Sequence, residues 1–242
     1  MKWRKLGLIF CASDTGDRML SYGRMPTQLH IEDDVYRIYF ESRNDINTAY
    51  PFYLDFDIKK LNILDIHSEP LLEYGAKGMF DDNGITPFTA VRDDNEIRLY
   101  YAGWNRMHNV PFRNAIGLAI SCDNGRTFKK YSNGPVFSQD LDEPIFPTGP
   151  QVLYEDGKWR MWYTSFERWE SLSGVTKHFY NIKYRESSDG VSWTTKPITA
   201  IDFESDHEYA FVCRSVINYR GRYMMWYSFR AQPGIPTYRI GY

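Results

Sequence analysis

The chain has 242 residues, a formal net charge of −2, 43% hydrophobic residues and 17% aromatic residues. This length suits one large domain, and no linker or low-complexity tract divides it. The lack of a basic run argues against a nucleic-acid surface, and no apolar segment is long enough to span a membrane. The scattered cysteines Cys11, Cys122 and Cys213 suggest no disulfide framework, which favours a reducing, cytoplasmic setting.

The N-terminus begins with basic residues and continues into a short apolar stretch at residues 6–10. That stretch is shorter than the apolar core of a secretory signal, and Asp14 and Asp17 follow it closely. We therefore interpret residues 6–10 as a β-strand of the folded domain.

Four copies of one aromatic and β-branched pattern then follow along the chain. They occupy residues 35–40, 96–101, 158–163 and 222–227. Residues of this kind favour strands. The aligned positions Tyr36, Ile97, Trp159 and Tyr223 are spaced by 61, 62 and 64 residues. A near-constant period predicts one structural unit used repeatedly.

Each copy has further predicted strands around it. A preceding strand is predicted at residues 26–31, 87–91, 150–154 and 214–219. The intervening turns, at residues 32–34, 93–95, 155–157 and 220–221, contain Asp, Asn or Gly, which suit tight hairpins. A third strand is predicted at residues 115–120, 181–184 and 238–241.

Two of these third strands continue into a turn that is closed by an aromatic residue. The turns span residues 121–128, which end at Phe128, and residues 187–193, which end at Trp193. Both resemble the Asp-box of sialidase-type propellers, in which the Asp ties down the turn and the aromatic side chain packs between sheets. The resemblance implies a structural role for Asp123 and Asp189.

Small antiparallel sheets repeated at a fixed period predict an all-β fold of the β-propeller type. We predict a single domain over residues 1–242, with repeats at approximately 20–80, 81–141, 142–205 and 206–242. The last repeat stops after its third strand and is incomplete. About four blades are therefore expected in this chain.

Four segments carry a resemblance to a known family: residues 3–7 (WRKLG), 80–87 (FDDNGITP), 101–105 (YAGWN) and 238–242 (YRIGY). With the repeated strands, they look like the five-bladed propellers related to glycoside hydrolase families 43, 32 and 130. The closest resemblance is to uncharacterised members associated with surface-polysaccharide biosynthesis. The resemblance covers essentially the whole chain and implies that part of a five-bladed ring is absent from it.

Most candidate site residues lie in the loops that precede the first strands, because these loops surround the mouth of a propeller. Trp104, Asn105 and Trp169 instead lie at the ends of second strands, where long insertions begin. Hydrolysis of a glycosidic bond needs two carboxyl groups on opposite sides of the bond. The predicted catalytic residues are Asp82, Glu143 and Glu208. The predicted substrate-binding residues are Arg24, Asp81, Asn83, Trp104, Asn105, Trp169, His207 and Arg214. No metal site and no cofactor are predicted.

Several of these residues also have a structural interpretation. Asp81 could cap a turn through backbone hydrogen bonds. Arg24 and Arg214 could hold an anionic sugar or phosphate, or form ion pairs between blades. Trp104 and Trp169 could stack on a sugar ring or pack beneath their loops.

The resemblance to family 43 implies one acid from each of the first three blades. Asp82 and Glu143 match the second and third positions, but residues 22–26 of the first blade contain no carboxylate. Three hypotheses follow: a glycan-processing enzyme that acts by hydrolysis or phosphorolysis, a non-catalytic carbohydrate-binding propeller in polysaccharide biosynthesis, or an inactive fragment. The expected partner is a carbohydrate or glycoconjugate, and the oligomeric state is left open. His108 and His178 are expected on the surface.

Overall fold

The structure is a computed structural model that describes residues 4–12, 17–172, 174–205, 208–230 and 237–242. These residues form fifteen strands and no helix, which confirms the predicted all-β class. The strands are β1 (Ser21–Glu32), β2 (Val35–Arg43), β3 (Ala49–Asp57), β4 (Asn62–His67), β5 (Ile85–Asp93), β6 (Glu96–Arg106), β7 (Phe112–Ser121), β8 (Lys129–Lys130), β9 (Phe146–Glu155), β10 (Lys158–Leu172), β11 (Val175–Ser187), β12 (Ile198–Ile201), β13 (Ala210–Tyr219), β14 (Arg222–Arg230) and β15 (Arg239–Gly241). None of the described segments is a helix that could cross a membrane.

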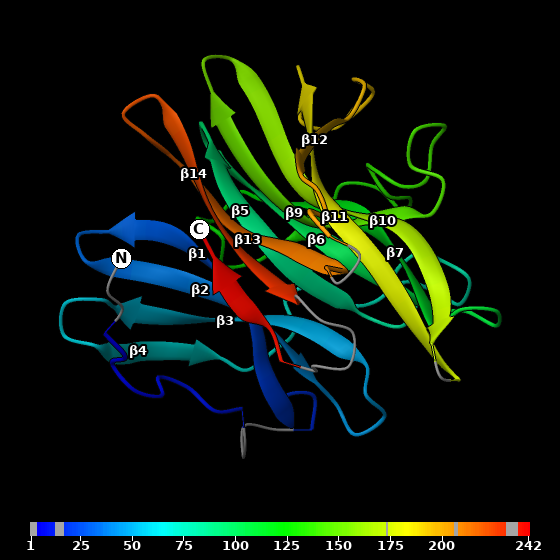
Figure 1. Ribbon diagram of the computed structural model, residues 1–242. Coiled ribbons are helices and arrows are strands. Elements are labelled where there is room, and N and C mark those ends of the chain that lie inside the picture. The colour runs from blue at the N-terminus through cyan, green and yellow to red at the C-terminus, as the bar shows by residue number, and fades with distance from the viewer. Residues whose placement is uncertain (1–3, 13–16, 173, 206–207, 231–236) are drawn as a thin grey trace.

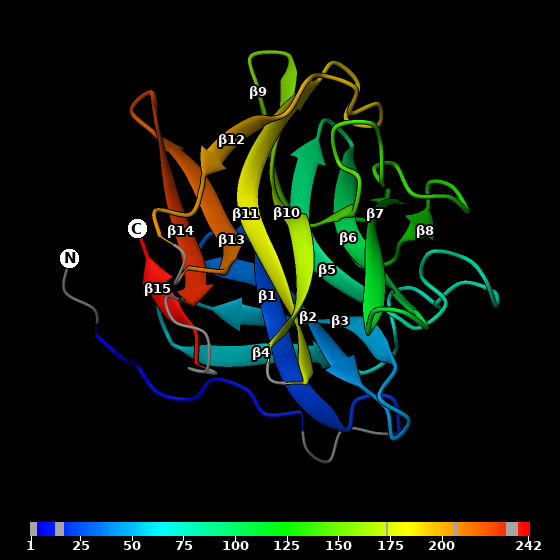
Figure 2. The same ribbon diagram turned by 45° about the vertical axis from the view of Figure 1, so that its right-hand side comes forward.

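The strands are arranged in three sheets (Figures 1 and 2). One sheet contains β1 to β4 and a second contains β5 to β8, each in chain order. The third has the order β15-β14-β13-β11-β10-β9, with β12 paired to β11. In this sheet β11 and β13 share a single parallel pair, Tyr180 with Ala210, which separates two antiparallel units. The third and fourth predicted repeats thus belong to one hydrogen-bonded sheet, and the repeat bounds and blade count stay predictions.

The four predicted hairpin turns have the backbone conformation that their residues favour. The residue with positive φ is Asp33 (44°), Asp94 (47°), Asp156 (52°) and Arg220 (54°). Asp tolerates this left-handed region better than most side chains, and Gly157 and Gly221 share it at two of the turns. The turn chemistry therefore fixes the register of each central hairpin.

The first strand of each unit lies near the middle of the molecule (Figure 1), where β1 packs beside β5, β5 beside β9 and β9 beside β13. Ala49 pairs with Gly84, and Tyr180 pairs with Ala210; both pairs are parallel. The units that each pair joins are therefore oriented in the same direction. We define the axial face as the face at which β1, β5, β9 and β13 begin and β2, β6, β10 and β14 end.

The two Asp-box turns are stabilised by their own aspartates, as the resemblance implied. Asp123 Oδ1 accepts hydrogen bonds from the amides of Arg126 (3.0 Å) and Thr127 (2.9 Å), and Asp189 Oδ1 accepts from those of Val191 (2.8 Å) and Ser192 (2.7 Å). The bonds from Thr127 lower the pKa of Asp123 to about 2 despite the opposing effect of desolvation. The structural role predicted for these turns is confirmed.

Each Asp-box turn also locks onto the preceding sheet. Tyr39 of β2 donates a hydrogen bond to Gly125 O (2.9 Å), and Tyr100 of β6 donates to Gly190 O (2.8 Å). Both glycines have positive φ, and an added Cβ would lie within 2.7 Å of the tyrosine hydroxyl. Glycine is therefore required at both points, where the turn backbone approaches the tyrosine closely.

Aromatic residues fill the space between neighbouring sheets. Phe128 contacts Tyr39 edge-on (centroids 5.7 Å apart), and Trp193 contacts Tyr100 in the same way (6.2 Å). The four rings are at most 8% exposed. Burial of large aromatic area between sheets explains much of the high aromatic content.

The predicted N-terminal strand is wrong. Residues 6–10 have no strand pairing, and Leu6, Leu8 and Ile9 are exposed. The segment instead lies across the first sheet, where it lines an apolar pocket with Phe40 and Leu54. The prediction rested on apolar composition alone. The segment lines a pocket of the first sheet but does not join its hydrogen-bond ladder.

Candidate functional site

A buried carboxylate, Glu41, lies at the axial end of β2. Its side chain is fully buried, and Arg43 Nε donates to Glu41 Oε1 at 2.7 Å. Thr86 of β5 donates through its hydroxyl to Glu41 Oε2 at 2.5 Å. Arg24 of β1 lies 3.6 Å from Glu41 Oε1 and is about one-third exposed (35%). The first sheet thus supplies an acid to this face from its second strand, although residues 22–26 contain none.

The backbone around Arg24 is unusual for a strand. Tyr22 (φ 69°) and Met25 (φ 53°) both have positive φ, and the β1–β2 register shifts on both sides of Arg24. Such irregularities bend a strand and redirect its side chains, and they occur often next to binding sites. Here they place Arg24 opposite Glu41 at the axial face.

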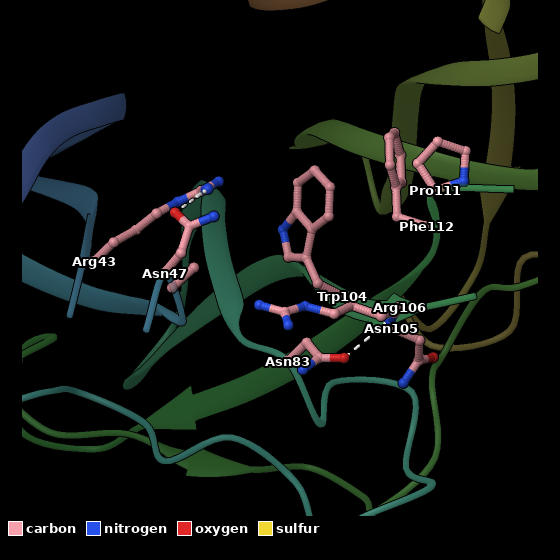
Figure 3. A pocket seen from close by; sticks show the side chains of 9 residues that line it. Arg43, Asn47, Asn83, Trp104, Asn105, Arg106, Pro111 and Phe112 are labelled. Carbon is pink, nitrogen blue, oxygen red and sulfur yellow. Dashed lines mark hydrogen bonds between the residues drawn. The ribbon is translucent and has the colours of Figure 1, made fainter. Parts of the chain in front are cut away.

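A pocket of about 170 Å³ opens beside this ion pair, between the first and second sheets. Arg43 and Asn47 lie on one side of it, Asn83 and Arg106 below, and Phe112 on the far side (Figure 3). It is also lined by Ala49, Trp104, Asn105 and Pro111. None of the residues that line it is a carboxylate. The pocket therefore offers two guanidinium groups, three side-chain amides and two aromatic rings.

Trp104 stands in the middle of this pocket (Figure 3). Its indole N–H donates to Thr86 Oγ1 at 2.8 Å, and its ring lies 5.0 Å from the ring of Phe112. A chain of hydrogen bonds thus runs from Trp104 through Thr86 to Glu41. Because its N–H is already bonded, Trp104 presents a fixed, half-buried ring surface to the pocket.

Asp82 and Asn83, both predicted site residues, stabilise the loop before β5. Asp82 Oδ2 accepts from the Gly78 amide (2.8 Å), and Asp82 Oδ1 accepts from Asn105 Nδ2 (2.7 Å). Asn83 Oδ1 accepts from the Arg106 amide (2.9 Å). Asp82 is half-buried at the rim of the pocket, and each of its oxygens already accepts a bond from the protein.

Asp81 and Glu143 occupy equivalent buried positions in successive units. Asp81 is 1% exposed and Glu143 is 0% exposed. Lys130 Nζ lies 2.5 Å from Asp81 Oδ2, and Lys183 Nζ lies 3.2 Å from Glu143 Oε1. Tyr163 donates to Glu143 Oε1 at 2.9 Å, and Ser165 donates to Oε2. Both acids thus anchor the loop that leads into a first strand, and neither carboxylate reaches solvent.

Glu208 stabilises its own loop, since its Oε2 accepts from the Glu204 amide at 2.6 Å. His207, a predicted binding residue, lies outside the described residues. In the described part of the chain, no group of His, Cys, Asp and Glu side chains could hold a metal ion. Asp82, Glu143 and Glu208 thus bond to separate groups of the protein, and their role as one catalytic set stays a prediction.

Arg214 lies on β13, the first strand of the last unit, and contacts β1. Its Nη1 approaches the sulfur of Met25. Burial and the nearby Arg24 guanidinium hold the pKa of Arg214 below its usual value. Among the described residues, no carboxylate contributes to this pKa. Arg214 is thus a half-buried cation that is repelled by Arg24 and is not compensated by a described acid.

Trp169 belongs to an aromatic cluster at the axial end of the β10–β11 hairpin. Its ring lies 5.4 Å from both Phe112 and His178. His178 is half-buried and stacks on Tyr180 (5.0 Å, 13°), so it is less accessible than its predicted surface position, whereas His108 is exposed as expected. Burial, Arg230 and Lys177 lower the pKa of His178 to about 4. The cluster extends the ring surface from Trp104 through Phe112 toward β13.

Sequence reasoning identified Arg24, Asn83, Trp104, Asn105 and Arg214 at this face. It missed four residues: Glu41, Arg43, Arg106 and Arg230. The sequence did contain a signal for Glu41. The repeat spacing aligns Glu41 with Ala102 and Thr164, so a charged residue stands where the other repeats have small ones.

No family model matches the chain. Two Mycobacterium tuberculosis proteins align with nearly all of it. The uncharacterized protein MT1551 is 37% identical over 231 residues, and the uncharacterized protein Rv1502 is 38% identical over 232 residues. Each alignment covers 95% of this chain and 76% of the mycobacterial protein. The chain belongs to the same family as these two proteins.

Solved glycosidase structures share the fold. A glycoside hydrolase superposes with a TM-score of 0.70 at 16% identity, covering 94% of this chain and 70% of that one. A thermostable family-43 glycoside hydrolase gives 0.65 at 21% identity, with coverage of 90% and 67%. A structure from work on family-130 mannoside phosphorylases and hydrolases gives 0.63 at 14% identity, with coverage of 86% and 62%. The chain therefore has the fold of glycosidase propellers.

Proposed function

We propose that this protein recognises a carbohydrate or glycoconjugate at the axial face, with the pocket around Trp104 as its central contact, and acts as a carbohydrate-binding propeller. One observation carries the proposal: the pocket combines a fixed indole ring, a second ring and three amide side chains, and no acid lines it. Apolar sugar faces pack on aromatic rings, and amides match the hydroxyl groups.

The state of the predicted acids favours binding over hydrolysis. Glu143 is fully buried, and both oxygens of Asp82 accept hydrogen bonds from the protein itself. A general acid or base must reach the proton that it transfers, directly or through one water. These two carboxylates would have to leave their present partners before they could act on a substrate.

Binding can be tested with Trp104→Ala on an array of bacterial surface-polysaccharide oligosaccharides. We expect wild-type protein to bind a subset saturably and the variant to lose about tenfold or more in affinity, since a stacking ring contributes more than 1 kcal/mol. Tyr131→Ala is the matched control, because Tyr131 is 54% exposed and does not line the pocket. Equal loss in both variants, or no glycan bound by wild type, would contradict the proposal.

Glycan processing by hydrolysis or phosphorolysis is the second candidate, and the position of Asp82 favours it. Asp82 is half-buried at the pocket rim, beside Asn105. Under this proposal Asp82, Glu143 and Glu208 supply the acid and base chemistry after substrate has rearranged their loops. Release of reducing ends, or of sugar phosphate when phosphate is added, should disappear in Asp82→Asn. Turnover that is unchanged in that variant would exclude Asp82.

The cellular setting that we propose is surface-polysaccharide biosynthesis in the cytoplasm, following the family resemblance. No disulfide joins Cys11, Cys122 and Cys213, which accords with this setting. We further propose a five-bladed architecture of which residues 1–242 provide about four blades. Association with membranes or with other copies of the chain is not part of the proposal.

A further inference from the structure

We propose that three arginines at the junction of β1, β13 and β14, namely Arg24, Arg214 and Arg230, bind an anionic group of the glycan, either a phosphate ester or a carboxylate. This inference rests on the proposed carbohydrate binding and adds the charge class of the ligand. The contacts of these three side chains carry the proposal.

Arg214 forms no ion pair with an acid among the described residues. Its guanidinium is half-buried between β13 and β1, its nearest described polar contact is the Met25 sulfur, and Arg24 is close enough to repel it. Leaving a charged group out of water without an opposite charge is costly, and native proteins usually pair such groups. An anion that binds beside Arg214 would supply the missing charge.

Arg230 lies at the axial end of β14 and has an unused donor. Its Nε is buried and has no hydrogen-bond partner among the described residues. The guanidinium lies over the ring of Tyr238 at 4.2 Å, which fixes its plane. Tyr238 also contributes to the pKa of Arg214, so the two arginines face a common region. An oriented planar donor is suited to a carboxylate or phosphate.

Arg24 connects this cluster to the pocket around Trp104. It is partly exposed, and its closest acid, Glu41, lies 3.6 Å away and is shared with Arg43. One buried carboxylate therefore serves two guanidinium groups, and Arg43 also lines the pocket. A glycan in the pocket would have its charged substituent within reach of Arg24.

The surrounding groups increase the positive potential. Burial, Arg230 and Lys177 all lower the pKa of the half-buried His178. Clustered cations in a partly desolvated region concentrate anions from solution.

The test uses the full chain and calorimetric titration at constant ionic strength. The probes are inorganic phosphate, glucose 1-phosphate, glucuronate and glucose. We expect saturable binding of at least one anion and none of glucose under the same conditions. Arg214→Gln should weaken anion binding about tenfold or more. Arg24→Gln provides a second variant, because this side chain is more exposed and its loss is less demanding of the fold.

Arg222→Gln is the matched control, since Arg222 is exposed at the far end of β14, beside the hairpin turn. A preference for glucose 1-phosphate over phosphate identifies a phosphate ester, and a preference for glucuronate identifies a carboxylate. The proposal is overturned if no anion binds, or if Arg222→Gln weakens binding as much as the axial variants. Oligosaccharide binding that depends on Trp104 but is unaffected by Arg214→Gln would retain the proposed function and remove this inference alone.

Discussion

Arginines are used differently on the two sides of this molecule. Where an Asp-box turn contacts the preceding sheet, Arg37 donates two hydrogen bonds to Asp55 (2.8 and 2.7 Å). Arg37 also donates to Asn124 O and stacks over Tyr53 at 4.1 Å. Arg98 repeats the arrangement with Glu96 and the Asp189 carbonyl. At the axial face, Arg214 has no described acid partner. The lesson is that partners decide whether a buried guanidinium holds the fold together or remains available to a ligand.

The largest effect should come from removing a fully paired arginine. Arg37→Gln leaves Asp55 without its bidentate partner and breaks the lock to Asn124. We expect the free energy of unfolding to fall by about 3–5 kcal/mol, as for other buried ion pairs that lose one member. Chemical denaturation measures this change.

The same change at Arg214 should be far milder. Arg214→Gln removes a cation that no described acid compensates, so we expect the free energy of unfolding to change by less than about 1 kcal/mol. Equal losses for Arg37→Gln and Arg214→Gln would break the comparison between the two sides.

The next largest loss of stability should come from removing the tyrosine hydroxyls that bond the Asp-box turns. Tyr100→Phe keeps the ring that packs on Trp193 but leaves Gly190 O without its donor. Loss of one buried hydrogen bond predicts a destabilisation of about 1–3 kcal/mol. Denaturation of Tyr39→Phe should give a similar value, because Tyr39 bonds Gly125 O in the same way.

His178 tests the electrostatics of the axial face. Its folded-state pKa of about 4 lies below the ordinary value of 6.5, so the unfolded state binds its proton first on acidification. The stability that neutral His178 contributes is present above about pH 6.5 and is lost as the pH falls toward 4. His178→Phe should flatten this part of the stability profile by about 1–2 kcal/mol. An unchanged slope would contradict the lowered pKa of His178.

The smallest effect is expected at an Asp-box aspartate. The folded-state pKa of Asp123 is about 2, below the ordinary carboxyl value, so its contribution is complete above about pH 4 and is lost as the pH falls toward 2. Asp123→Asn should remove this dependence. Because Asp123 is exposed, we expect less than about 1 kcal/mol. Acid titration of both proteins, followed by fluorescence, would show it.

Much of the fold was predictable because its signals are local. Strand composition, the turn residues and the spacing of the repeat gave the all-β class and the hairpins. The Asp-box aspartates could be assigned a structural role because their bonds reach only three or four residues along the chain. The N-terminal segment was misassigned because strand pairing depends on neighbours that are distant in sequence.

The site was less predictable because its chemistry depends on partners from other strands. Asp82 and Glu143 satisfy every rule for a candidate acid until their bonds to Asn105 and Lys183 are seen. Glu41 and Arg43 were overlooked although they also lie at the end of a second strand, because Trp104 and Trp169 were chosen as residues that precede long insertions. Only the fold shows that both ends share one face.

The contacts between the Asp-box turns and the preceding sheets have a consequence for synthesis on the ribosome. Tyr39 and its acceptor Gly125 are 86 residues apart, so the first sheet must wait for the second to emerge before this contact can form. At translation rates of 5–20 residues per second, the delay is roughly 4–17 s. During that interval the aromatic face around Tyr39 lacks its contacts with Gly125 and Phe128.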